Sequence, residues 1–378
     1  GYSGNMEGNQ KGLIWNLRYS GKQAHAYQNK YDGYVYGSGF NENTFGGIIG
    51  MNKSWGYSHF HFSAYRLIPE IVEGERDSAT GKFIRGYALN DSTVMDTIVP
   101  DNEMKSYAPG IPHQDIVHYK AVMNSNFIIG NGYLKTIFGF QQNHRKEFAE
   151  VVAPDDYGLY FLLNTMTYDL RYLFPEKKKL VMSAGINGMR QSSQNKGNEF
   201  LVPQYNLFDI GGFFTVKKSY EKFDISGGIR YDTRTINADE LLLDTLGNPT
   251  TEEHPFHLHK FKKFKNSFSS ISGSAGFAYQ FSEYVFAKAN ISKGFRAPTI
   301  AELGANGEHE GTGRYEIGNP SLRPENSLQL DYALGINSHH ISAEIDLFYN
   351  SISNFIYTTK LNSMLGGDSV ISISDPIP

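Results

Sequence analysis

Apolar and polar residues alternate with a period of two along much of this chain. Between residues 270 and 281, Phe277, Tyr279 and Phe281 stand at odd positions, whereas serines and Gln280 stand at even ones. The alternation continues over 285–292 and returns over 327–336 and 341–350. An extended strand turns successive side chains to opposite faces, whereas a helix repeats every three to four residues. The pattern therefore predicts β-strands with one apolar and one polar face.

About twelve to fourteen such segments are expected. They cover 12–19, 44–55, 57–67, 115–129, 132–147, 157–174, 178–191, 205–218, 221–236, 267–281, 284–296, 325–337, 339–359 and, as a fourteenth, 368–374. Many reach the length of ~9–11 residues that a tilted strand needs to cross a bilayer. Strands of globular proteins more often have about 5–6 residues.

The predicted connections alternate strictly between short and long. Short turns are expected near Gly56, Gly130–Gly132, Pro175–Lys177, Ser219–Glu221, Ser282–Glu283 and Ser338–His339, and long connections at about 68–114, 148–156, 193–204, 237–266 and 297–324. Antiparallel neighbours put alternate turns at opposite ends, so one end would be compact and the other elaborate. Outer-membrane barrels have this asymmetry, whereas a β-sandwich or propeller does not usually sort its loops in this way. We therefore expect an all-β chain that forms a transmembrane antiparallel β-barrel.

Composition narrows the alternatives further. The 378 residues contain no cysteine, which excludes disulfides, thiolate metal sites and a cysteine nucleophile. A formal charge of -4 argues against a nucleic-acid partner, which normally requires a strong basic excess. The mean hydropathy is -0.42, and no apolar run approaches the ~18–20 residues of a membrane-spanning helix. A polar average is nevertheless expected of a barrel whose strands alternate between lipid and water.

Aromatic residues support a membrane location. The chain has 25 tyrosines and 26 phenylalanines. They crowd the ends of two predicted strands, as Tyr157, Tyr160, Tyr168, Tyr172 and Phe174 in one case and Tyr279, Phe281, Tyr284 and Phe286 in the other. Aromatic girdles of this kind mark the two water–lipid interfaces of outer-membrane barrels.

Two motifs are specific enough to indicate a family. The segment 290–303 reads NISKGFRAPTIAEL, and the segment 318–327 reads GNPSLRPENS. In this order and spacing they resemble the "GFRAPT-x-x-EL" and "GNPxLxPExS" segments of TonB-dependent outer-membrane receptors. Weaker similarity lies at 139–148 and 350–357, and the rest of the chain matches only in rhythm.

The resemblance implies a function as well as a fold. Members form barrels of about 22 strands, filled by an N-terminal plug that contacts the energy-coupling protein TonB. They import a scarce, bulky nutrient into the periplasm, and an iron chelate (a siderophore or haem) is the first expectation. An importer of cobalamin or oligosaccharides and a passive porin are the alternatives. The expected surroundings are outer-membrane lipid and lipopolysaccharide, with neither a cofactor nor enzymatic activity.

The chain departs from the family pattern at both ends. Strands are expected from about Leu13 onward, which leaves no room for a plug, and no closing aromatic strand precedes Pro378. We therefore expect residues 1–378 to be the barrel region of a larger receptor, without the plug and the last strands.

The family motifs supply the site candidates. A mainly structural role is expected for Gly294, Phe295, Arg296, Pro298, Glu302, Asn319, Pro320, Leu322, Pro324 and Glu325. Candidate ligand contacts on the extracellular side are Arg296, Glu308, His309, Glu310, Arg314, Tyr315 and Glu316. Proline ends ladder pairing and stiffens the backbone, which favours a rim scaffold over a ligand contact for Arg296 and Glu325.

Other charged residues are expected to have structural roles that are common in barrels. Charges on the polar face are expected to pair with one another or with a plug, and they are Asp224, Arg230, Asp232, Lys288, Asp331, Glu344 and Asp346. Glu344 and Asp346 could be read as a catalytic pair, but pairing within the lumen is favoured. His254, His257 and His259 cluster in a long loop, and the His-x-His pair of His257 and His259 could bind a transition metal or haem iron. No further ligand can be assigned to them, so a solvated loop is expected, and no catalytic or metal site is predicted.

A basic run between residues 260 and 265 interleaves lysines with phenylalanines. Such interleaving can bind single-stranded nucleic acid. Contact with anionic lipopolysaccharide at the outer rim is favoured instead, so no nucleic-acid partner is expected.

Overall fold

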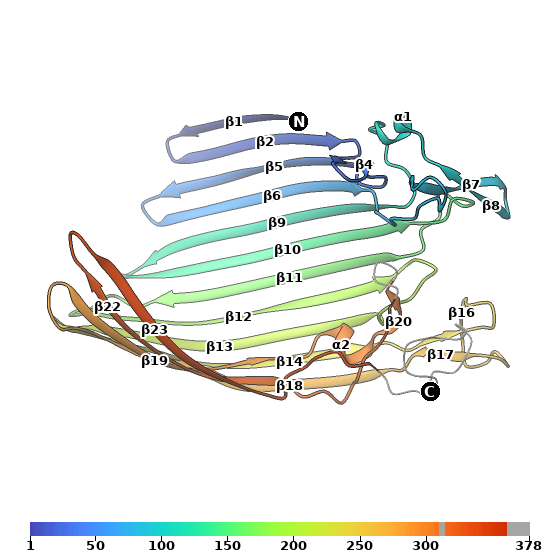
Figure 1. Ribbon diagram of the computed structural model, residues 1–378. Coiled ribbons are helices and arrows are strands. Elements are labelled where there is room, and N and C mark those ends of the chain that lie inside the picture. Colours follow the sequence, from blue (N-terminus) through green and yellow to red (C-terminus); the bar gives the residue numbers. More distant parts are fainter. Residues whose placement is uncertain (310–313, 361–378) are drawn as a thin grey trace.

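In the computed structural model, which describes residues 1–309 and 314–360, most of the chain forms one antiparallel sheet. Figure 1 shows a strongly curved sheet in which β1 and β23 form the two edges. Its strands, in spatial order, are β1 (Tyr2–Gln10), β2 (Leu13–Ala24), β5 (Phe40–Lys53), β6 (Gly56–Pro69), β9 (His113–Ile129), β10 (Gly132–Phe148), β11 (Tyr160–Leu173), β12 (Leu180–Asn195), β13 (Tyr205–Ser219), β14 (Phe223–Ala238), β18 (Phe264–Gln280), β19 (Val285–Arg296), β22 (Glu325–Asn337) and β23 (Ser342–Ser353). Each strand pairs with the next large strand along the chain.

The two faces of the sheet differ as the alternation predicts. Opposed residues of paired strands lie on the same face. Ile229 is opposite Phe214 and Gly273, and Tyr231 is opposite Ile271, so their side chains share one face. Large exposed side chains continue on this face from Trp15 in β2 to Leu347 in β23. We call this side the apolar face and the opposite side the polar face.

Short and long connections are sorted to opposite ends, as predicted (Figure 1). Aromatic pairs gather where the strands meet the short turns. Examples are Trp55 with Phe127, with ring centroids 5.6 Å apart, and Tyr220 with Phe223, 4.3 Å apart. Tyr279 and Phe281 form a further pair, with ring centroids 4.9 Å apart. Amphipathic rings in such a band suit a water–lipid interface.

The long connections carry small elements of their own. These are β3 (Gln28–Asn29), β4 (Gly33–Tyr34), β7 (Ile84–Asn90), β8 (Thr93–Ile98), α1 (Asp101–Met104), β15 (Leu241–Leu243), β16 (Pro249–Thr250), β17 (Leu258–Phe261), α2 (Ile300–Gly304), β20 (Asn306–His309) and β21 (Arg314–Ile317). Over 1–309 and 314–360, no helix is both long and apolar enough to cross a membrane.

The start of the sheet corrects one expectation. The first strand begins at Tyr2 and not near Leu13, because β1 pairs with β2 through Met6 and Leu17. A turn at Lys11 and Gly12, both with positive φ, joins the two strands. The predicted strand at 368–374 lies outside the described residues.

Candidate functional site at the end with the long loops

The family-motif segment leaves the sheet and returns to it at the same level. β19 ends at Arg296, β22 begins at Glu325, and these two residues are opposite each other in the ladder. Between them lie α2 and the hairpin of β20 and β21. Pro298, two residues after Arg296, is fully buried, and its expected role in ending the ladder stays a prediction. The connection is therefore a structured loop with its two ends clamped together.

The guanidinium of Arg296 joins three parts of this loop. Its Nε donates to Glu325 Oε2 at 2.7 Å, and its Nη1 donates to both carboxylate oxygens of Glu302 at 2.9 Å. The other oxygen of Glu325 accepts from the backbone N–H of Ile356 at 2.7 Å, just after β23. One side chain thus connects β19, α2 and β22, and through Glu325 the segment after β23. These contacts favour the scaffold role expected for Arg296 and Glu325, which stays a prediction.

Glu302 also caps the start of α2. Its Oε2 accepts from the backbone N–H of Thr299 at 2.7 Å, and Thr299 Oγ1 accepts from the N–H of Glu302 at 3.3 Å. This reciprocal capping box fixes the first turn of a short helix. Partial burial favours the neutral acid, but the hydrogen bonds from Arg296 and Thr299 outweigh it and hold the pKa of Glu302 below its usual range.

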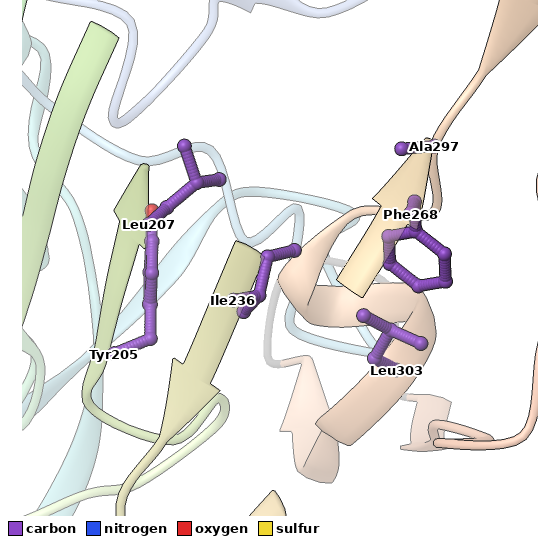
Figure 2. Packing of buried hydrophobic residues seen from close by; sticks show 6 residues of the cluster. All are labelled: Tyr205, Leu207, Ile236, Phe268, Ala297 and Leu303. Carbon is purple, nitrogen blue, oxygen red and sulfur yellow. The ribbon is translucent and has the colours of Figure 1, made fainter. Parts of the chain in front are cut away.

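An apolar cluster fixes α2 on the polar face of the sheet. Leu303 has no exposed surface, and it packs with Ile236 of β14 and Phe268 of β18. Figure 2 shows these side chains converging with the others of the cluster, which are Tyr205, Leu207 and Ala297. Leu322 of the returning segment packs against the same cluster. The buried core therefore sits on the polar face and holds the loop over it.

Close backbone contact locks the returning segment onto α2. The N–H of Gly318 donates to Ala305 O at 2.7 Å, and the N–H of Asn319 donates to Glu302 O at 2.8 Å. A Cβ at Gly318 would collide with the backbone between Leu303 and Ala305. Glycine is therefore required here for close approach.

A hollow of about 570 Å³ lies on the same face, beside the start of the loop. Arg234 makes two hydrogen bonds to Asp209, at 2.7 and 2.6 Å. Arg230 Nε donates to Asp232 Oδ2 at 2.7 Å, and its Nη2 donates to Asn187 Oδ1 at 2.7 Å. Carboxylate and guanidinium groups therefore neutralise one another along the wall. Bidentate arginine–carboxylate pairs hold such a wall in fixed geometry.

Sequence reasoning identified part of this wall and missed the rest. The expected mutual pairing of polar-face charges is confirmed for Arg230 with Asp232 and for Lys288 with Glu344, whose Nζ and Oε1 lie 2.9 Å apart. Asp209 and Arg234 were not predicted as part of the wall, although the alternation of β13 and β14 puts both on the polar face. Their cross-strand register was the missing information.

The predicted ligand contacts lie beyond α2. Tyr315 donates from its hydroxyl to Asn306 Oδ1 at 2.8 Å, and burial raises the pKa of that hydroxyl. Glu316 is half-buried in β21, opposite Gly307. Glu308 and His309 end β20, Arg314 begins β21, and Glu310 lies outside the described residues. Their role as ligand contacts stays a prediction.

The remaining motif residues have local structural partners. Asn319 Oδ1 accepts from the N–H of Ser321 at 2.9 Å, and Pro320 O accepts from Asn266 Nδ2 at 2.8 Å. Pro324 O accepts from both Asn326 and Asn354 at 3.2 Å. Gly294 is opposite Ser327 in the ladder, next to Phe295, which packs on the apolar cluster. Among the described residues, no three histidine or acidic side chains form a group that could hold a metal ion.

A large antiparallel sheet with an apolar face, and with short and long connections sorted to opposite ends, is the architecture of the wall of an outer-membrane β-barrel. A family model for the β-barrel of TonB-dependent receptors matches residues 1–375, and the chain belongs to this family. The family model thus covers nearly the whole chain, including both motif segments.

Solved structures share the fold at low sequence identity. A double mutant of the Serratia marcescens hemophore receptor HasR, in complex with its hemophore HasA and heme, is 14% identical with a TM-score of 0.63. The FrpB iron transporter of Neisseria meningitidis is 12% identical with a TM-score of 0.62, and the Yersinia pestis ferric yersiniabactin uptake receptor FyuA is 12% identical with a TM-score of 0.54. The matches cover 93%, 97% and 93% of this chain, but only 52%, 54% and 52% of those chains. This chain therefore spans about half the length of each.

Proposed function

We propose that this chain is the barrel part of an outer-membrane receptor that binds a scarce, bulky nutrient and imports it with energy supplied through TonB. The observation that carries the proposal is the clamped motif loop, packed by Leu303 onto the polar face beside a hollow lined by paired charges. Such a loop presents its outer part at the mouth of the barrel while its base stays rigid. A rigid base lowers the ordering cost of binding.

The proposed nutrient is an iron chelate, either a siderophore or haem. Support comes from the structural relatives, which include a hemophore receptor in complex with its hemophore and heme, an iron transporter and a ferric yersiniabactin uptake receptor. Another relative is a copper transporter, so the fold alone does not select the cargo. Cobalamin and oligosaccharides are the competing cargoes.

The partners follow from the same proposal. The apolar face contacts outer-membrane lipid, and the long loops lie at the cell surface near lipopolysaccharide. A plug domain lies against the polar face and couples to TonB. Binding and transport need no covalent step, so the receptor acts without catalysis and without a resident cofactor.

Deletion of the gene tests this function. Under iron starvation, the deleted cells should lose uptake of at least one radiolabelled ferric siderophore or of haem. The loss should equal that of cells lacking TonB, and the intact gene should restore uptake. Unchanged uptake of all ferric chelates and of haem would contradict the iron assignment.

A conductance measurement separates this function from passive diffusion. The purified full-length receptor should be nearly silent in planar bilayers, because a plugged barrel has no open path. Steady ion conductance would instead support a porin.

A further inference from the structure

A histidine pair lies on a small sheet beside the clamped loop, which contacts this sheet through the hydrogen bond from Asn306 Nδ2 to Lys260 O at 2.7 Å. The connection between β14 and β18 forms a three-stranded sheet in the order β16–β15–β17. His259 lies in β17 opposite Leu242 of β15, and His257 directly precedes β17. Leu242 and Phe261 are both buried, and the register places His259 on the same face of this sheet as Leu242. The histidine pair therefore has a folded support.

The two imidazoles lie next to each other. They are two residues apart in the chain, with His257 just outside β17 and His259 within it. Their ring centroids are 6.0 Å apart, with an angle of 74° between the ring planes. His259 is exposed over 44% of its side chain, so the pair is open to solutes.

Both rings are held through the same nitrogen. His259 Nδ1 lies 2.9 Å from Glu240 Oε1, and His257 Nδ1 lies 2.8 Å from the backbone oxygen of His254. Because both partners are acceptors, Nδ1 carries the proton in the neutral ring and the lone pair is on Nε2. A metal-binding histidine usually donates its second N–H to a carboxylate or a backbone carbonyl in this way. This arrangement is not visible in the sequence, which favoured a simple solvated loop.

We infer that His257 and His259 bind one divalent first-row transition-metal ion through their two Nε2 atoms. Imidazole suits Ni²⁺, Cu²⁺ and Zn²⁺, and the order of affinities favours Cu²⁺. No third histidine or acidic ligand joins the pair within the described part of the chain. The remaining coordination positions are therefore filled by water or by a donor group from solution. Glu240 acts as a positioning residue, because it orients His259 without touching the ion.

A second pair with the same spacing provides a matched control. His59 and His61 lie on the polar face of β6, with ring centroids 6.4 Å apart. His59 Nε2 is already 2.7 Å from Asn52 Oδ1, so this pair does not offer two free Nε2 atoms. The same spacing without the same hydrogen bonding should therefore not bind the ion.

The test uses the intact receptor, purified in detergent and titrated with Zn²⁺ by calorimetry and with Cu²⁺ by electron paramagnetic resonance. The wild-type Cu²⁺ spectrum should show coupling to the nitrogens of both imidazoles, and each of His257→Ala and His259→Ala should lose one of them. The double variant should lose the bound ion. Glu240→Gln should weaken binding by about 10- to 100-fold, the usual effect of removing such a hydrogen-bond partner.

The controls decide the assignment. His254→Ala keeps the backbone oxygen that holds His257 and should bind normally, as should the variant with both His59→Ala and His61→Ala. Unchanged binding by the variant with both His257→Ala and His259→Ala would overturn the inference. So would loss of the ion in either control. Heat-modifiable mobility on gels verifies that every variant is folded.

Discussion

Replacement of Ile229 by arginine should destabilise the protein folded in a bilayer by about 2–4 kcal/mol, the cost of a cation on the lipid-facing side near the membrane midplane. Ile229 lies in the middle of β14, and it is 58% exposed in the isolated chain. Its neighbours across the ladder are Phe214 and Gly273, so the substituted side chain would point into hydrocarbon. Equilibrium unfolding of the receptor in lipid vesicles measures the effect.

Ser274→Arg is the matched control for this variant. Ser274 is opposite Gly228, the residue before Ile229. It therefore lies on the polar face at nearly the same membrane depth as Ile229. Water or a plug meets that face, so the control should cost clearly less. If Ser274→Arg destabilises the receptor as much as Ile229→Arg, the assignment of the apolar face to lipid is wrong.

Arg296→Met should loosen the clamped loop, because Glu302 and Glu325 would face each other without the guanidinium. Hydrogen bonds to charged groups are worth about 1.5–3 kcal/mol, and exposed ion pairs are worth much less. Because Arg296 is 42% exposed, we expect a loss of about 1–2 kcal/mol, at the low end of that range. The loss should appear as faster proteolysis within 297–324 and as reduced nutrient uptake.

Lys288→Met is the control for Arg296→Met within the same strand. Lys288 forms an ion pair with Glu344, and both side chains are more exposed than that of Glu325. Its removal should leave the loop protected. Adding Glu325→Gln to Arg296→Met should restore part of the protection, because it removes an unpaired carboxylate. Equal rates of proteolysis for Arg296→Met and Lys288→Met would contradict the conclusion that Arg296 clamps the loop.

The clamp should also depend on pH. The pKa of Glu302 is lowered in the folded state from an ordinary value of 4.5. A lowered carboxyl pKa stabilises the fold above the unfolded value, and this contribution is lost as the pH falls through the folded value. The loop should therefore be equally protected at all pH values above about 5 and should become protease-sensitive in stronger acid.

The sheet could be predicted well because its signal is local. In β18 and β22 the alternation of apolar and polar residues in the sequence predicts which face each side chain occupies. The register of the paired strands agrees with this prediction. β1 carries no such signal, because its only large apolar residues, Tyr2 and Met6, are four positions apart among glycines and asparagines. It is a strand because β2 offers it a partner, and that information is not local.

The candidate site was only half predictable. The motifs predict a rim scaffold at Arg296, Pro298 and Glu325, because proline ends ladder pairing, and this role stays a prediction. The position of α2 on the polar face depends on Leu303 meeting Ile236 and Phe268 from distant strands. Only the three-dimensional register brings these residues together. The small hairpins in the long connections, such as β7 with β8, were missed for the same reason.

Surface labelling of single cysteines tests most directly whether these strands cross the outer membrane with the long loops outside. The chain has no cysteine, so introduced thiols stand alone within it. In an otherwise cysteine-free full receptor, Ser92→Cys and Thr251→Cys mark the long connections, while Asn131→Cys and Glu221→Cys mark the short turns. A membrane-impermeant maleimide should label the first two in intact cells and the last two only after the outer membrane is opened. Labelling of the short turns in intact cells, or no labelling of the long connections, would contradict this topology.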